Sequence, residues 1–122
     1  MKVRGIRGAV TVDANTSDAI FHATKQLMEE IIERNQLDCD NVASVLLTMT
    51  PDLTASFPAK AVRSIPGWQW VPLMCAVELN IEGALPRCIR VLLHVNTDQP
   101  QDELNHVYLG GATVLRPDLA DR

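Results

Sequence analysis

The stretch Cys88–Val95, with the sequence CIRVLLHV, is an apolar run that carries one charged residue, Arg90. Gly83 and Pro86 separate it from the preceding apolar segment. An apolar run bounded by turn residues predicts a β-strand. A guanidinium near a core is costly unless a counter-ion or a ligand compensates for its burial. Arg90 therefore needs a partner, either within the protein or in a ligand.

On either side of this run, strand patterns alternate with one long helical pattern. Strands are predicted over Val3–Val12, Ala43–Met49, Val71–Leu79, the region of His106–Leu109, and Ala112–Leu115. Helical segments are predicted from N-cap candidates in Asn15–Asp18 to about Asn35, over Ala59–Ser64 after Pro58, and as one turn at Asp102–Asn105. This order predicts a single domain, residues 1–122, with a mostly antiparallel or mixed sheet and the long helix packed on one face.

The charge composition hints at a small anionic ligand. The chain has 122 residues and a formal net charge of −4, which argues against a nucleic-acid surface built from Lys and Arg. Of its 11 basic residues all but Lys2, Lys25 and Lys60 are Arg. Arg recognises carboxylates and phosphates with a planar fork, so this bias favours an anion-binding protein, with codon or genome bias as the alternative.

Several motifs are missing from the sequence. The three cysteines form no CxxC pair, which is typical of a reduced, cytoplasmic protein. No signal peptide, membrane-length apolar run, metal-ligand cluster or nucleotide-binding glycine motif is present. We therefore expect a cytoplasmic protein without a metal, a cofactor or a membrane partner. If it is an enzyme, it has few obvious chemical groups.

Two charges, Arg90 and Glu78, occupy strand positions that would normally be apolar. They could form a structural ion pair, or Arg90 could lie at a sheet edge with its stem buried. Alternatively, Arg90 faces an open pocket and binds an anion. Arg7 favours the pocket, because its neighbours Gly5, Gly8 and Ala9 would leave space above their strand.

Five collinear segments carry a family resemblance. They are RGIRGA (Arg4–Ala9), TPDLTASFPAKAVR (Thr50–Arg63), GWQWVPLMCAVEL (Gly67–Leu79), PRCIRVLLHVNTDQPQDELNHVYL (Pro86–Leu109) and TVLRPDL (Thr113–Leu119). Together they closely resemble the monofunctional chorismate mutases of the small trimeric α/β-barrel type, as distinct from the all-helical type. The resemblance implies an α/β fold of the α+β kind, in which a five-stranded mixed sheet packs with one long helix. Three such subunits would form a pseudo α/β-barrel, with active sites between neighbours.

The resemblance also implies a reaction, the conversion of chorismate to prephenate in aromatic amino acid biosynthesis. This step is a pericyclic Claisen rearrangement, so it needs no nucleophile, metal or redox cofactor. Catalysis would come from holding a folded conformer and stabilising the charge that develops as the ether bond breaks.

The resemblance assigns four catalytic positions. Arg90 is similar to the family arginine that donates to the ether oxygen and reaches a substrate carboxylate. Arg7 matches the arginine that grips a carboxylate, and Tyr108 matches a phenol that hydrogen-bonds to the same ligand. Glu78 resembles the carboxylate that accepts a hydrogen bond from the ring hydroxyl.

The implied substrate-binding residues come from three segments. They are Phe57, Ala59, Lys60 and Arg63 from a loop of the neighbouring subunit, Leu73, Met74, Cys75, Ala76 and Val77 along one wall, and Leu115 and Arg116 near the entrance. Met74 departs from the family pattern, where Thr is also expected, but the implied contact there is largely through the backbone. For Cys75 a packing and backbone role is expected rather than a nucleophilic one. A short C-terminal tail from about residue 116 is a candidate mobile segment.

Two further hypotheses remain at the level of sequence. One is an imine or enamine hydrolase of the related trimeric fold, which would need an activated water. The other is a non-catalytic trimer that binds a dicarboxylate of the aromatic pathway.

Overall fold

The computed structural model describes residues 1–116, in which five strands and two α-helices are joined by short 3₁₀ helices. In chain order the main elements are β1 (Lys2–Thr11), α1 (Ser17–Asn35), β2 (Val42–Met49), α2 (Ala59–Arg63), β3 (Leu73–Val77), β4 (Cys88–Thr97) and β5 (Val107–Leu109). The 3₁₀ helices are Cys39–Asn41, Trp68–Trp70, Gln101–Glu103 and Gly110–Val114.

The five strands form one mixed sheet in the order β3-β2-β4-β1-β5. The central strand, β4, pairs antiparallel with β1 and with β2. The outer strands are parallel to their neighbours, β3 to β2 and β5 to β1. The prediction of a five-stranded mixed sheet is confirmed. Because β4 is the middle strand, the hypothesis that Arg90 lies at a sheet edge is wrong.

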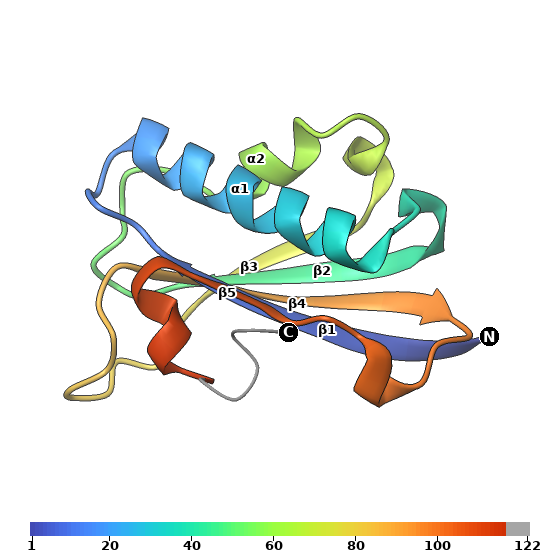
Figure 1. Cartoon of the computed structure of the whole chain (residues 1–122). Coiled ribbons are helices and arrows are strands. Elements are labelled where there is room, and N and C mark those ends of the chain that lie inside the picture. The colour runs from blue at the N-terminus through green and yellow to red at the C-terminus, as the bar shows by residue number, and fades with distance from the viewer. Residues whose placement is uncertain (117–122) are drawn as a thin grey trace.

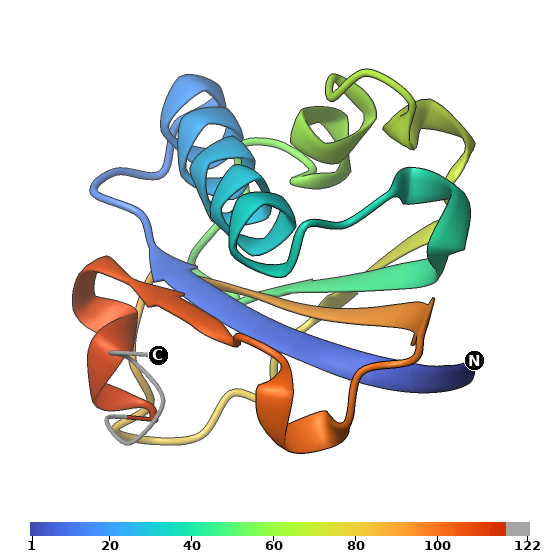
Figure 2. The ribbon, with the colours of Figure 1, turned by 45° about the vertical axis from the view of Figure 1, so that its right-hand side comes forward.

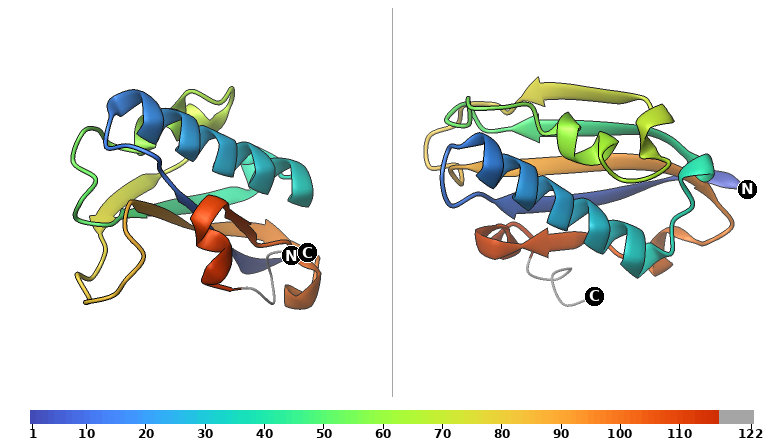
Figure 3. Two further views of the ribbon diagram at one scale, coloured as in Figure 1. Left: turned by 60° about the vertical axis from the view of Figure 1, so that its left-hand side comes forward. Right: turned by 90° about the horizontal axis from the view of Figure 1, so that it is seen from above.

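Both α-helices cover the same face of this sheet (Figures 1 and 2). Seen from above, α1 runs obliquely over the strands and α2 lies beside it (Figure 3). The hydroxyl of Thr16 caps α1 by accepting a hydrogen bond from the Ala19 N–H, and Gln36 ends the helix in a left-handed conformation. The predicted helix is therefore confirmed at both ends.

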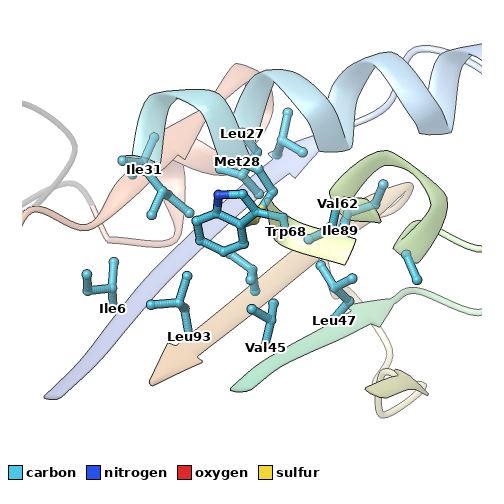
Figure 4. Close-up of a cluster of buried hydrophobic side chains, with 14 of the residues drawn as sticks. Ile6, Leu27, Met28, Ile31, Val45, Leu47, Val62, Trp68, Ile89 and Leu93 are labelled. Atoms are coloured by element: carbon cyan, nitrogen blue, oxygen red, sulfur yellow. The ribbon is translucent and has the colours of Figure 1, made fainter. Parts of the chain in front are cut away.

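The main core lies between the helices and the sheet. Leu27, Met28 and Ile31 of α1 point toward Ile6 and Leu93 of the strands (Figure 4). The other large, fully buried side chains of this core are Ile20, Val45, Leu47, Val62, Ile89 and Val107. Period-2 alternation leaves the opposite residues of the same strands on the uncovered face of the sheet.

Gly8 belongs to the helix side of β1, which corrects one expectation. A Cβ at this position would lie 2.9 Å from the Ile31 side chain and 3.0 Å from the Val107 carbonyl oxygen. The absence of a side chain therefore allows close packing of α1 and β5 against β1, and does not leave space around Arg7 as we expected. On the other face of β1, a Cβ at Gly5 would meet only the Leu92 side chain, at 3.5 Å.

The strand predicted over Ala112–Leu115 is wrong, because this segment is the 3₁₀ helix Gly110–Val114. Gly110 has φ of +59°, which turns the chain away from the sheet, and the Gly111 N–H donates to the Thr11 hydroxyl. The turn buries Ala112 beneath the sheet and ends the pairing of β5 with β1.

Other boundaries differ by a few residues. β3 is shorter than the predicted Val71–Leu79, and β4 extends two residues beyond Val95. The predicted turn at Asp102–Asn105 is the 3₁₀ helix Gln101–Glu103. The last residues of the Thr113–Leu119 segment, and the tail beyond residue 116, lie outside the described residues.

Candidate active site

A cavity of about 270 Å³ opens on the face of the sheet that the helices leave uncovered. Its lining comprises Arg7, Gly8, Ala9, Leu46, Thr48, Glu78, Arg90, Val91, Leu92 and Tyr108. This set includes all four residues expected to be catalytic. Arg7 lies on β1, Glu78 follows β3, Arg90 lies on β4 and Tyr108 on β5. The fold thus brings together residues that are far apart in the sequence.

Strand register explains how these side chains meet. Arg90 of β4 is paired with Thr48 of β2 on one side and with Ala9 of β1 on the other. Ala9 is in turn paired with Tyr108 of β5. Paired residues project to the same face of a sheet. A row of Thr48, Arg90, Ala9 and Tyr108 therefore crosses four strands, and the small Ala9 keeps the space between Arg90 and Tyr108 open.

Arg90 and Glu78 form an ion pair in which Arg90 Nε lies 3.1 Å from Glu78 Oε1. Their side chains are 33% and 19% exposed, so both charges are partly desolvated. The same Glu78 oxygen accepts a hydrogen bond from the Thr48 hydroxyl. The ion pair and the pocket, which the sequence offered as alternatives for Arg90, are thus both present.

Two residues of the cavity lining, Arg90 and Tyr108, each carry a buried polar atom. Arg90 Nε and the Tyr108 hydroxyl have no hydrogen-bond partner among the residues that the structure describes. Arg90 Nε is close to Glu78, but its N–H is not aligned for a hydrogen bond to it. Leaving a buried donor unsatisfied costs about 1–3 kcal/mol. Unsatisfied donors on two residues that line one cavity favour an anionic or oxygen-rich ligand there.

Cys88 begins β4, two residues before Arg90 and on the same face of the sheet. It is fully buried in a small cluster with Ala9, Tyr108 and Ala112, and Leu115 packs against the same cluster. Burial raises the pKa of the Cys88 thiol, although nearby Arg90 opposes the shift. The thiol therefore stays neutral and serves as apolar support for Arg90 and Tyr108.

The remaining predicted site residues do not line this cavity. Phe57, Cys75, Ala76 and Val77 line a second hollow of about 390 Å³. Ala59 is buried on α2, whereas Lys60 and Arg63 are exposed on it, and α2 lies on the helix-covered side of the sheet (Figure 1). Leu73, Leu115 and Arg116 are half-buried, and Met74 is exposed. One chain brings together the four catalytic candidates, with Leu115 beneath them, and leaves the others apart.

Thr48 is the polar cavity residue that sequence reasoning missed. It lies in a nearly continuous apolar run, ASVLLTM, where a hydroxyl carries no obvious signal. Only the pairing of β2 with β4 places it beside Arg90. Sequence reasoning also missed the apolar cavity residues Leu46 and Leu92, because only strand pairing places them on the cavity's face of the sheet.

The entrance to β4, two residues before Arg90, is held by a cluster around Asp52. The Asp52 carboxylate accepts hydrogen bonds from the Arg87 N–H and from the Thr50 hydroxyl. The Thr50 hydroxyl in turn accepts from the Cys88 N–H at 3.0 Å. Arg87 has φ of +46°, a left-handed conformation that a non-glycine residue rarely adopts. Asp52 thus secures a strained turn that sets where β4 begins.

We expect the stability of the protein to depend on the charge of Asp52. The Thr50 hydrogen bond and, next, the bond from the Arg87 backbone lower the pKa of this carboxyl despite its partial desolvation. A lowered pKa stabilises the fold above the unfolded-state value of about 4, and this contribution is lost as pH falls through the folded-state pKa. Asp52→Asn should therefore lower Tm at pH 7, and the difference from the wild type should shrink on acidification.

Thermal melts between about pH 2 and 7 would test this linkage. Asp13→Asn, at an exposed residue after β1, is the matched control and should leave Tm unchanged. A deficit in Asp52→Asn that stays constant across the acidic range would contradict the electrostatic account.

Metal and membrane features add little to this picture. In the described part of the chain, Asp38, Cys39 and Asp40 have ligand atoms within 4.8 Å of one another. Asp38 already accepts a hydrogen bond from the Asp40 N–H, and exposed acidic groups are common without an ion. Among residues 1–116, no helix combines the length and apolar character needed to cross a membrane.

The fold and the cavity define a small α+β protein with a charged cavity on the open face of its sheet, lined by Arg7, Glu78, Arg90 and Tyr108. The model of the family "Chorismate mutase type I" matches residues 3–119. The chain is 53% identical over 120 residues to chorismate mutase AroH of Bacillus subtilis (strain 168), covering 98% of this chain and 94% of that protein. It is 51% identical over 118 residues to chorismate mutase AroH of Thermus thermophilus, covering 96% of each.

A solved structure agrees with these matches. A chorismate mutase from Clostridium thermocellum, Cth-682, superposes with a TM-score of 0.87 at 47% identity, covering 90% of this chain and 97% of that one. The chain belongs to the type I chorismate mutase family. The family resemblance seen in the sequence is thereby confirmed.

Proposed function

We propose that the protein converts chorismate to prephenate in the cavity between β1, β2, β4 and β5, as a step of aromatic amino acid biosynthesis. Family membership over nearly the whole chain supports the reaction and makes the chain an isomerase. The observation that carries the site is the pair of unsatisfied donors, Arg90 Nε and the Tyr108 hydroxyl, on the wall of one cavity.

A pericyclic rearrangement asks little of the protein beyond shape and charge. The substrate must be held in its folded conformer, and negative charge must be stabilised on the ether oxygen as its bond to carbon breaks. Arg90 is preorganised for this role, because the central position of β4 and the ion pair with Glu78 restrain its guanidinium. A cation placed at developing charge contributes about 10²–10³-fold in rate.

The other three residues bind the ground state and the transition state alike. Arg7 is exposed at the cavity and offers its fork to a substrate carboxylate. The Tyr108 hydroxyl donates to the same ligand from a buried position. Glu78 accepts a hydrogen bond from the ring hydroxyl while it holds Arg90. The cavity thus presents cations to a dianion and one carboxylate to a hydroxyl.

The segment that carries Phe57, Ala59, Lys60 and Arg63 acts from a neighbouring subunit of a homotrimer. Phe57, Lys60 and Arg63 lie away from the cavity of their own chain, so they can reach an active site only across an interface. The edge strand β3 supports such an interface, because Met74 and Val77 are 68% and 70% exposed. Exposed apolar side chains along an edge strand are typical of an association surface.

The trimer predicts a definite mass. Light scattering on the eluted protein should give the mass of three 13.5 kDa chains, and all turnover should be found in that species. A monomer that retains full activity would contradict the hypothesis that the active site is shared between subunits.

Direct assay tests the reaction itself. Purified protein is incubated with chorismate, and prephenate formation is followed by NMR against the spontaneous rate. Turnover above that rate is the expected result. A hydrolase would instead act on imines or enamines with uptake of water, and a binding protein would hold chorismate unchanged, so either outcome would contradict the proposal.

We also place the enzyme in the cytoplasm. All three cysteines, Cys39, Cys75 and Cys88, are free thiols, as expected in a reducing compartment.

A further inference from the structure

We propose that Thr48 is a positioning residue for the rearrangement, holding Glu78 in place so that Arg90 stays free to donate to the substrate. The inference deepens the function proposed above and rests on it. Thr48 is not among the residues that the sequence assigned to the site. In the structure its hydroxyl donates a hydrogen bond to the carboxylate of Glu78, which also forms the ion pair with Arg90.

Glu78 needs a restraint because of its place in the fold. It follows the last residue of β3, an edge strand, and its backbone is tied to the sheet by the bond from its N–H to the Met49 carbonyl at 2.8 Å. A glutamate side chain has three rotatable bonds and loses substantial entropy when it is ordered. The backbone alone therefore does not determine where this carboxylate lies.

Thr48 supplies the restraint from a rigid position. It lies on the inner strand β2, paired with Arg90 of β4 on one side and with Ala76 of β3 on the other. Its β-branched side chain has few rotamers, so its hydroxyl is fixed at the cavity wall. The residue is half-buried, which shields its bond to Glu78 from water.

The hydrogen bond from Thr48 determines which atoms of Glu78 and Arg90 remain able to bind a ligand. Thr48 and Arg90 both approach Glu78 Oε1, so Oε2 is the atom that can accept from a ligand hydroxyl. Since the hydroxyl satisfies Oε1, the Arg90 N–H groups need not turn onto it. This matches the geometry of Arg90 Nε, which lies 3.1 Å from Oε1 and yet makes no hydrogen bond within the described chain.

Removing the hydroxyl should therefore redirect Arg90. In Thr48→Val the shape is kept and the donor is lost, so Arg90 becomes the main donor to Glu78. We expect kcat to fall about tenfold, a typical effect of one hydrogen bond to a charged group, with a smaller change in KM. Thr48→Ser keeps the hydroxyl and should stay within about threefold of the wild type.

A control variant and a double-mutant cycle separate positioning from packing. Ser44→Ala removes another hydroxyl from the same face of β2, one that contacts His94 outside the cavity, and should not change kcat. In a Glu78→Gln background, Thr48→Val should cost much less than tenfold, because the contact it serves is already altered.

Each outcome bears on a distinct claim. Unchanged kcat in Thr48→Val, an equal loss in Thr48→Ser, or a full additional loss in the Glu78→Gln background would each overturn the positioning role. Absence of wild-type turnover would instead contradict the proposed function. In that case a crystal structure of Thr48→Val still decides the contact, since an unmoved Glu78 carboxylate would overturn the inference and a displaced one would support it.

Discussion

Replacing Arg90 with alanine is expected to lower kcat by about 10²–10³-fold or more. Arg90 lies on the central strand and lines the cavity, and its Nε has no hydrogen-bond partner among residues 1–116. Its loss removes a donor aimed at charge that exists only in the transition state, so kcat should fall more than KM rises. Steady-state kinetics with chorismate measure both quantities.

Two further variants make the Arg90 result specific. Arg90→Lys keeps the charge and loses the planar fork, so it should recover only part of the rate. Arg34→Ala removes another ion-paired arginine, which pairs with Glu30 on α1 at 2.9 Å, and should leave kcat unchanged. Near-normal turnover in Arg90→Ala would assign this arginine to structure alone.

Arg7→Ala is expected to lower kcat/KM by about 10–10²-fold, the effect of losing a charge-assisted hydrogen bond to a carboxylate. The side chain is exposed at the cavity, so its removal should leave Tm unchanged. The tie between this part of β1 and the start of β5 uses the Arg7 backbone N–H, which donates to His106 Nδ1 at 2.9 Å and survives the substitution. Kinetics and thermal melts of the same sample measure the two effects.

Arg4→Ala is the matched control for Arg7. It removes an arginine three positions earlier on β1, whose Nε donates to the Gln99 carbonyl and does not line the cavity. Its kcat/KM should equal that of the wild type. If Arg7→Ala instead lowered Tm strongly and left kcat/KM near normal, the ligand role of Arg7 would be wrong.

Local patterns predicted most of the fold. The apolar run around Arg90 forms the central strand, and the apolar stripe of residues 17–35 forms one face of α1. Both could be predicted because the spacing of apolar residues indicates which face of an element is buried. The prediction of a strand over Ala112–Leu115 was wrong because Gly110 adopts a positive φ and the Gly111 N–H donates to the Thr11 hydroxyl. Thr11 lies 100 positions before Gly111 in the sequence, so local propensity does not predict this hydrogen bond.

For the candidate site, the rule that charges within apolar strands need partners singled out Glu78 and Arg90. The family resemblance added the roles of Arg7 and Tyr108, and all four residues line one cavity. The sequence alone therefore predicted a polar site and the charged residues proposed for it. Only tertiary structure decided that Thr48 joins them, that Gly8 serves helix packing, and that Lys60 and Arg63 lie apart from the cavity. The physical reason is register: strand pairing sets which side chains share a face, and long-range hydrogen bonds determine that pairing.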